Sequence, residues 1–100
     1  MSDFAEALDR AEDAIREIVP VIVRRHRAAG TLTWRLMHQI EGELLQDLSA
    51  SGRHNARLLG MLRSSGLMEY PKDDTEVSLE GHEAVPVVFS EVYKAWRRVD

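Results

Sequence analysis

The chain has 100 residues, of which 44% are hydrophobic and 30% charged, with no cysteine and a formal net charge of −4. This length indicates one domain, and the lack of cysteine excludes a disulfide framework and a thiolate metal site. Since no apolar run approaches the ~20 residues of a membrane span, and the acidic start lacks the layout of a signal peptide, we expect a cytoplasmic protein.

The charge of the chain alternates from segment to segment. Residues 1–19 sum to −4 and residues 20–35 to +4, and a second basic segment, residues 51–66, sums to +3. The most acidic segment is residues 67–83, which sum to −5. A nucleic acid requires local positive charge on the protein surface. The net charge therefore argues against such a partner unless the basic segments face it together.

The first segment has a helical pattern of apolar side chains. They recur at alternating steps of four and three residues: Phe4, Leu8, Ala11, Ile15 and Ile18. This spacing predicts a helix over residues 3–19 with one apolar face. Two interpretations of that face are open: it packs on its own domain, or it pairs two subunits as a short coiled-coil seam.

Pro20 is expected to interrupt this helix, because it lacks a backbone donor and disfavours helical geometry at the preceding residue. A second helix over residues 20–29 would then end at Gly30. This helix carries a basic cluster of four residues: Arg24, Arg25, His26 and Arg27. The cluster is either a solvated helix end favoured by the helix dipole or a contact surface for phosphates.

Two further helices are predicted around a polar turn. Thr33 is expected to cap a helix over residues 34–50, with a break near Gly42. The turn follows at residues 49–52, and the next helix covers residues 53–64.

The last part of the chain predicts a hairpin and a closing helix. Strands are expected at residues 67–70 and 75–79, joined by a tight polar turn at residues 71–74. The closing helix should begin near Ala84 and run to about the end of the chain, because Pro86 is tolerated only in a first turn.

This order of elements resembles the winged helix-turn-helix of MarR- and PadR-type bacterial regulators. The residues in register with those families are Glu43, Leu44, Leu48, Leu58, Leu62, Gly66 and Leu67. Residues 77–83 also look like the exit from the wing in those families. The resemblance covers residues 31–85.

The resemblance implies a mainly α fold with a small β-hairpin, organised as a single domain over residues 1–100. Within it, residues 31–83 would form the winged helix-turn-helix. Residues 1–30 would form N-terminal helices that can serve dimerisation, and residues 84–100 the C-terminal helix.

The function implied by the resemblance is that of a sequence-specific, double-stranded DNA-binding transcriptional regulator of the repressor type. Its recognition helix, near residues 52–64, would enter the major groove, where Arg53 contacts a guanine and Asn55 an adenine edge. The implied DNA-binding residues are Ser51, Arg53, His54, Asn55, Arg57 and Lys72. A homodimer through the terminal helices would place two such helices about one DNA turn apart. The sequence does not indicate which small-molecule effector, if any, such a regulator would bind.

The tip of the expected wing is acidic, with Asp73 and Asp74 beside Lys72. A wing that touches phosphates should be basic. The alternative is therefore a protein–protein interaction module, or a small inhibitor or adaptor subunit, that does not bind DNA. The histidines lack the spacing of metal ligands, and there is no Gly-rich phosphate loop, so we expect neither an enzyme nor a metal or cofactor.

The distribution of charge in space discriminates between these two functions. DNA binding predicts that residues 24–27, 53–63 and 94–98 lie on one face, with residues 1–17 and 73–83 turned away. Basic segments scattered around the surface would favour the interaction module.

Overall fold

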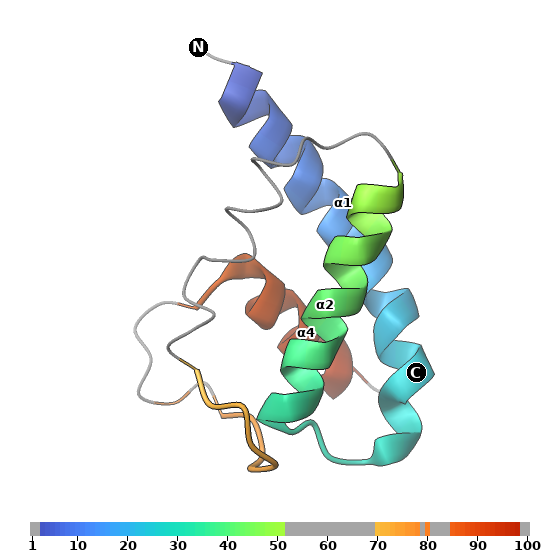
Figure 1. The fold of residues 1–100 in the computed structure, drawn as a ribbon, viewed down its shortest axis with the longest axis vertical. Helices are drawn as coiled ribbons and strands as arrows, with labels where there is room; N and C mark the ends of the chain where they lie inside the picture. Colours follow the sequence, from blue (N-terminus) through green and yellow to red (C-terminus); the bar gives the residue numbers. More distant parts are fainter. Residues whose placement is uncertain (1–2, 52–69, 79, 81–84, 99–100) are drawn as a thin grey trace.

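The structure, a computed structural model, describes residues 3–51, 70–78, 80 and 85–98. Its helices in this part of the chain are α1 (Asp3–His26), α2 (Trp34–Ala50) and α4 (Val87–Arg97), and a short 3-10 helix, η1 (Arg27–Ala29), follows α1 directly. In Figure 1, α1 and α2 run side by side in opposite directions, and α4 crosses behind α2 toward the end of α1. None of these helices combines the length and apolar character that crossing a bilayer requires.

α1 is one continuous helix, so the predicted interruption at Pro20 is wrong. Proline removes the N–H that would bond to the carbonyl of Arg16 one turn earlier. Apolar side chains on both sides of Pro20 are at most 2% exposed: Ile15, Val19, Ile22 and Val23. Their burial stabilises the helix by more than the missing hydrogen bond costs. The predicted end is confirmed, since Gly30 caps η1 with a φ of 85°.

The predicted apolar face of α1 packs on the protein's own core. Ala11 and Ile15 are fully buried in the single chain, and Leu8 and Ile18 are partly buried against the same core. Packing within the domain is therefore the interpretation that the structure shows. A subunit contact through α1 would have to use its other faces.

The predicted start of α2 is confirmed. The Oγ1 of Thr33 accepts a hydrogen bond from the N–H of Leu36 at 3.1 Å, which satisfies one of the free donors of the first turn. The break expected near Gly42 is absent, because α2 continues without interruption to Ala50. The apolar residues of the helix recur on one face and are buried, so tertiary packing outweighs the low helix propensity of glycine.

The predicted winged helix with a β-hairpin is wrong. The described residues form helices and contain no β-strand; their extended pairing is an isolated antiparallel bridge between Thr33 and Glu76. Residues 75–78 were expected to pair with residues 67–70, of which only Tyr70 is described. They pair instead with the residues that lead into α2.

Two backbone hydrogen bonds fix this pairing. The N–H of Val77 donates to the carbonyl of Leu32 at 2.8 Å, and the N–H of Trp34 donates to the carbonyl of Thr75 at 3.0 Å. Val77 is buried in the core beside this bridge. The pairing is one bridge long because Trp34 already begins α2, whose helical backbone cannot continue a β-ladder.

The core closes around Phe89 of α4. The ring of Phe89 lies 4.9 Å from that of Tyr70, 5.9 Å from that of Trp34 and 5.6 Å from that of His38, centroid to centroid. These contacts join α4, α2 and the segment at residues 70–78. α4 itself begins at Val87, with Pro86 just before its first turn, which is later than the predicted start near Ala84.

Candidate functional site

Two of the six predicted DNA-binding residues lie in the described part of the chain. Ser51 is the C-cap of α2, and its hydroxyl donates to the carbonyl of Leu48 at 2.8 Å. Lys72 is exposed in the turn beside the N-terminus of α2. The 17 residues of α2, roughly 25 Å at 1.5 Å per residue, therefore separate the two.

The other four predicted DNA-binding residues lie outside the described residues: Arg53, His54, Asn55 and Arg57. Their role stays a prediction. Because Ser51 and Lys72 lie at opposite ends of α2, the structure does not bring these two together into one site.

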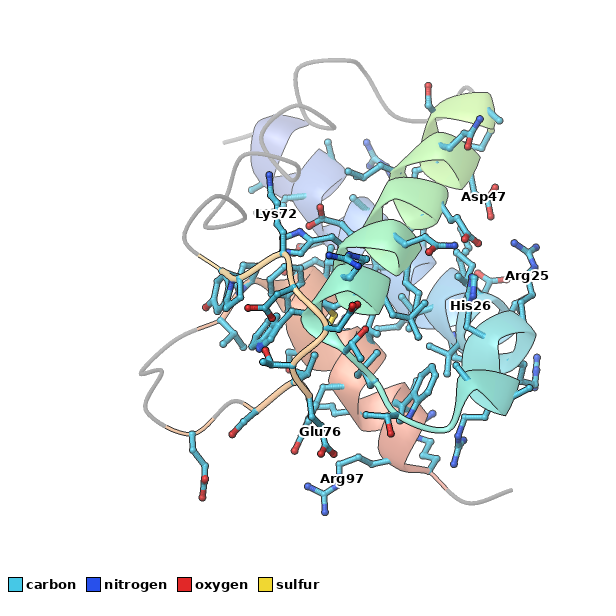
Figure 2. The ribbon with its side chains drawn as sticks, turned by 60° about the horizontal axis from the view of Figure 1, so that its bottom comes forward. Arg25, His26, Asp47, Lys72, Glu76 and Arg97 are labelled. Carbon is cyan, nitrogen blue, oxygen red and sulfur yellow. The ribbon has the colours of Figure 1, made fainter. Side chains whose placement is uncertain are left out.

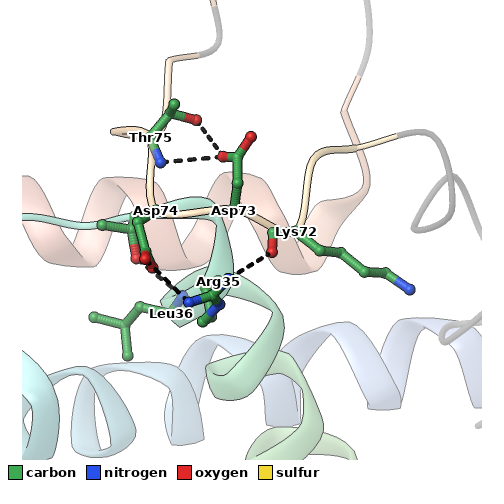
Figure 3. A network of polar contacts seen from close by, with 7 residues as sticks. Arg35, Leu36, Lys72, Asp73, Asp74 and Thr75 are labelled. Carbon is green, nitrogen blue, oxygen red and sulfur yellow. Dashed lines mark hydrogen bonds and ion pairs between the residues drawn. The ribbon is translucent and has the colours of Figure 1, made fainter.

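The turn at residues 72–75 is fixed to the first turn of α2 by Arg35 (Figure 3). The Nη1 of Arg35 lies 3.0 Å from Oδ2 of Asp74, and its Nη2 donates to the carbonyl of Lys72 at 3.5 Å. The side chain of Lys72 points away from this network. Asp74 therefore has an intramolecular ion-pair partner on α2, so its charge in this turn is explained without an external ligand.

Asp73 stabilises the same turn from within. Its Oδ1 accepts hydrogen bonds from the hydroxyl and from the backbone N–H of Thr75, the latter at 3.0 Å. The Thr75 hydroxyl, followed by the Thr75 N–H, lowers the pKa of Asp73 below its ordinary value, because both favour the charged carboxylate.

The basic cluster at the end of α1 lies beside the basic end of α4. The Nη1 of Arg27 donates to the carbonyl of Arg98 at 2.9 Å and joins the two ends. A small depression of about 130 Å³ lies between them, and the described residues of its lining include three arginines and no acidic residue. We call it the arginine depression; it is lined by Pro20, Val23, Arg24, Arg27, Ala95 and Arg98.

Glu43 of α2 neutralises the neighbouring part of the basic cluster. The Nη1 of Arg25 lies 3.7 Å from Oε1 of Glu43, and the Nε2 of His26 lies 2.8 Å from Oε2. Within the described part of the chain, no ion pair involves Arg24, Arg27 or Arg98. The arginine depression thus keeps its positive charge, which the negative dipole ends of the helices that stop there help to stabilise.

A second and larger depression, of about 480 Å³, lies on the other side of Arg27. We call it the mixed depression, because its lining contains charges of both signs and two aromatic rings. It is lined by Arg27, Gly30, Leu32, Glu76, Val77, Tyr93, Trp96 and Arg97. Figure 2 shows Glu76 and Arg97 near each other at this end of the molecule, whereas Arg25 and His26 lie on another side.

The sequence identified part of this arrangement. The DNA-binding hypothesis treats residues 24–27 as a possible phosphate surface and predicts that residues 94–98 lie on the same face. The structure brings these two segments together. The same hypothesis predicts that residues 73–83 are turned away from this basic face, but Glu76 lines the adjoining mixed depression. Tyr93 and Trp96 were not recognised as site residues. Their spacing of three residues beside Arg97 was the available signal, since it places them on one side of a helix.

Comparison with known proteins assigns the chain to a family but does not indicate an activity. Residues 1–100 match the model of a family described as Protein of unknown function (DUF2471). No curated protein and no solved structure matches the chain. The two depressions are therefore the basis for inferring what the protein binds.

Proposed function

Because the chain belongs to the DUF2471 family, whose description gives no activity, we propose a function from its geometry: the protein binds duplex DNA by the phosphate backbone. The contact surface is the arginine depression between the ends of α1 and α4. The observation that carries the proposal is that the described residues around one small depression include three arginines and no acid.

Arginine suits a phosphate ligand for geometric reasons. A guanidinium presents five N–H donors in a planar fork that matches two phosphate oxygens, and it stays charged at any physiological pH. The depression, at about 130 Å³, has roughly four times the 30 Å³ that one water molecule occupies in the liquid. It therefore has room for a phosphate group with some of its hydration water.

The charge around the depression favours a polymer of phosphates over a single one. Arg97 extends the basic surface along the end of α4, whereas Arg25 is paired with Glu43 and Lys94 with Glu91. The acidic residues of α1 lie toward its other end: Asp3, Glu6, Asp9, Glu12, Asp13 and Glu17. At 1.5 Å per residue, Asp3 and Arg24 are roughly 30 Å apart along the helix, so a protein of negative net charge still presents one basic end.

The test is a titration of a labelled random duplex, followed by fluorescence anisotropy at ~50 mM salt. We expect saturable binding that weakens steeply as salt rises, because bound phosphates release counterions. Replacing both Arg24 and Arg98 with glutamine should weaken binding by about tenfold or more. It should also lower the salt slope by about one for each phosphate that the variant no longer neutralises.

A matched control is the double variant Arg10→Gln, Arg16→Gln, which removes the same net charge from the acidic half of α1. It should bind DNA nearly as well as the wild type. Equal losses in the two variants would show that only net charge matters and would overturn the assigned surface, as would a lack of duplex binding at ~50 mM salt.

An acidic protein partner is the competing outcome of the same measurements. Polyglutamate that binds the wild type, is weakened by the Arg24 and Arg98 substitutions, and is not displaced by duplex DNA would favour an interaction module. Duplex that displaces polyglutamate at equal charge concentration supports the proposal.

Regulation of transcription and a cytoplasmic location belong to the same proposal. Backbone contacts supply affinity and position, whereas sequence-specific regulation requires contacts to base edges. The sequence assigns those contacts to Arg53 and Asn55, which lie outside the described residues.

A further inference from the structure

The mixed depression has charges of both signs that do not neutralise one another. Arg27 and Arg97 line it from η1 and α4, and Glu76 lines it from the segment that pairs with the start of α2. In the described part of the chain, neither arginine forms an ion pair with Glu76. Three formal charges thus border one depression without forming an internal salt bridge.

The two arginines are held in place by aromatic rings. The guanidinium carbon of Arg27 lies 5.8 Å from the ring centroid of Trp96, and that of Arg97 lies 5.5 Å from the ring centroid of Tyr93. Arg27 also donates to the Arg98 carbonyl, and Arg97 donates to the Tyr93 hydroxyl at 3.1 Å. Within the described residues, these hydrogen bonds use one of the five N–H donors of each guanidinium, which leaves donors for a ligand.

From this arrangement we propose that the mixed depression binds a small zwitterion, an α-amino acid with an apolar side chain. Arg27 and Arg97 bind its carboxylate, and Glu76 binds its ammonium group. The side chain lies against the apolar part of the lining, which consists of Leu32, Val77 and the rings of Tyr93 and Trp96. The site goes beyond DNA binding and does not depend on it.

The charges of the lining select this class of ligand. A phosphate-like anion would face the carboxylate of Glu76, and a simple cation would face two guanidinium groups, so both meet like charge. A protein terminus carries only one of the two charges, whereas a free amino acid carries both on neighbouring atoms. The volume, about 480 Å³, lies within the 300–1,000 Å³ typical of small-molecule sites, so size does not exclude an amino acid.

The test uses three related probes in the absence of DNA. L-leucine carries both charges, L-leucinamide lacks the carboxylate, and N-acetyl-L-leucine lacks the ammonium group. Isothermal titration calorimetry or chemical-shift titration of the tryptophan side chains should show saturable binding of L-leucine. Each neutralised analogue should bind about tenfold more weakly, because it leaves a charged group of the site without its partner.

A variant at Glu76 makes the test specific to this depression. In Glu76→Gln, the affinity for L-leucine should fall to about that for N-acetyl-L-leucine, and the affinity for the acetylated probe should stay nearly constant. Glu80→Gln is the matched control, an exposed glutamate outside the lining, and should bind L-leucine as the wild type does. Circular dichroism checks that both variants are folded.

The proposal is overturned if L-leucine does not bind at millimolar concentration, if the three probes bind equally, or if Glu76→Gln and Glu80→Gln behave alike. None of these outcomes bears on duplex binding, because Arg24 and Arg98 line the arginine depression alone.

Discussion

At the scale of single residues, Asp73 shows how one side chain fixes an exposed turn. Its carboxylate accepts two hydrogen bonds from Thr75, and the next residue, Asp74, pairs with Arg35 on α2. The sequence alone suggests that these two acids form a charged surface for a partner. In the structure, their contacts are internal and hold the turn against α2.

The lowered pKa of Asp73 predicts a pH-dependent contribution to stability. A depressed pKa in the folded state means that this contribution is present above the unfolded-state value of 3.8 and is lost as the pH falls through the folded-state value. The Asp73→Ala variant should therefore be less stable than the wild type at neutral pH. Urea unfolding should show the difference shrinking as the pH is lowered to about 3.

The Asp73→Asn variant is the control for this pH dependence. It keeps an oxygen acceptor for the Thr75 donors and loses the titrating group. Its stability difference from Asp73→Ala should stay constant between neutral pH and about pH 3. A gap between wild type and Asp73→Ala that is as large in acid as at neutral pH would contradict the role assigned to the carboxylate.

At the scale of elements, two glycines that look alike in the sequence have opposite roles. Gly42 lies inside α2 with a helical backbone, and Gly30 ends η1 with a φ of 85°. A Cβ atom added to either glycine would meet no atom within 4 Å. The effect of an alanine substitution on stability therefore depends on the backbone conformation at each glycine and not on steric clashes with neighbouring atoms.

We expect Gly42→Ala to raise the free energy of unfolding by about 0.5–1 kcal/mol, because alanine loses less conformational entropy in a helix. Gly30→Ala should lower it by about 1 kcal/mol, because a side chain disfavours positive φ. Urea denaturation of the two variants measures both changes. Shifts of the same sign would mean that one of these two backbone conformations is misassigned.

Local patterns predict the elements of this protein better than they predict how the elements meet. The apolar periodicity of α1 and the cap at Thr33 depend on residues within one or two turns, and both are confirmed. The predicted interruption at Pro20 is wrong because the burial of Val19, Ile22 and Val23 outweighs the local cost of proline. The pairing of Thr33 with Glu76 joins residues 43 positions apart, and no short-range pattern predicts such a contact.

The candidate site shows the same difference between local patterns, which the sequence reveals, and contacts between distant segments, which it does not. The sequence marks Arg24 and Arg27 as a basic cluster, because adjacent charges are visible without a structure. It does not reveal that Arg98 completes one depression or that Glu76 and Arg97 border another, since these residues come from separate segments. Residues that form a site only through tertiary structure remain hidden until the helices are placed.

At the scale of the whole molecule, one aromatic ring joins otherwise separate parts of the core. Phe89 is fully buried and contacts rings from α2 and from Tyr70. Phe89→Ala should lower the free energy of unfolding by about 3–5 kcal/mol, through reduced burial and the cavity left behind. For a domain whose total stability is of order 5–15 kcal/mol, this loss would leave a substantial unfolded population only near the lower limit of that range.

The control for this core prediction is Val21→Ala, since Val21 is 43% exposed on the outer side of α1. It should change the free energy of unfolding by less than about 0.5 kcal/mol in the same denaturation experiment. A comparably small effect for Phe89→Ala would show that the core does not close around that ring.

The capping of α2 couples its first turn to a remote part of the chain. The N–H groups of Trp34 and Arg35 donate to the carbonyls of Thr75 and Asp73, the latter at 2.8 Å. Helix ends ordinarily fray, and their first amide protons exchange rapidly with solvent. Here those protons become accessible only when the turn at residues 72–75 detaches. Their exchange therefore reports the opening of that turn and not the fraying of α2.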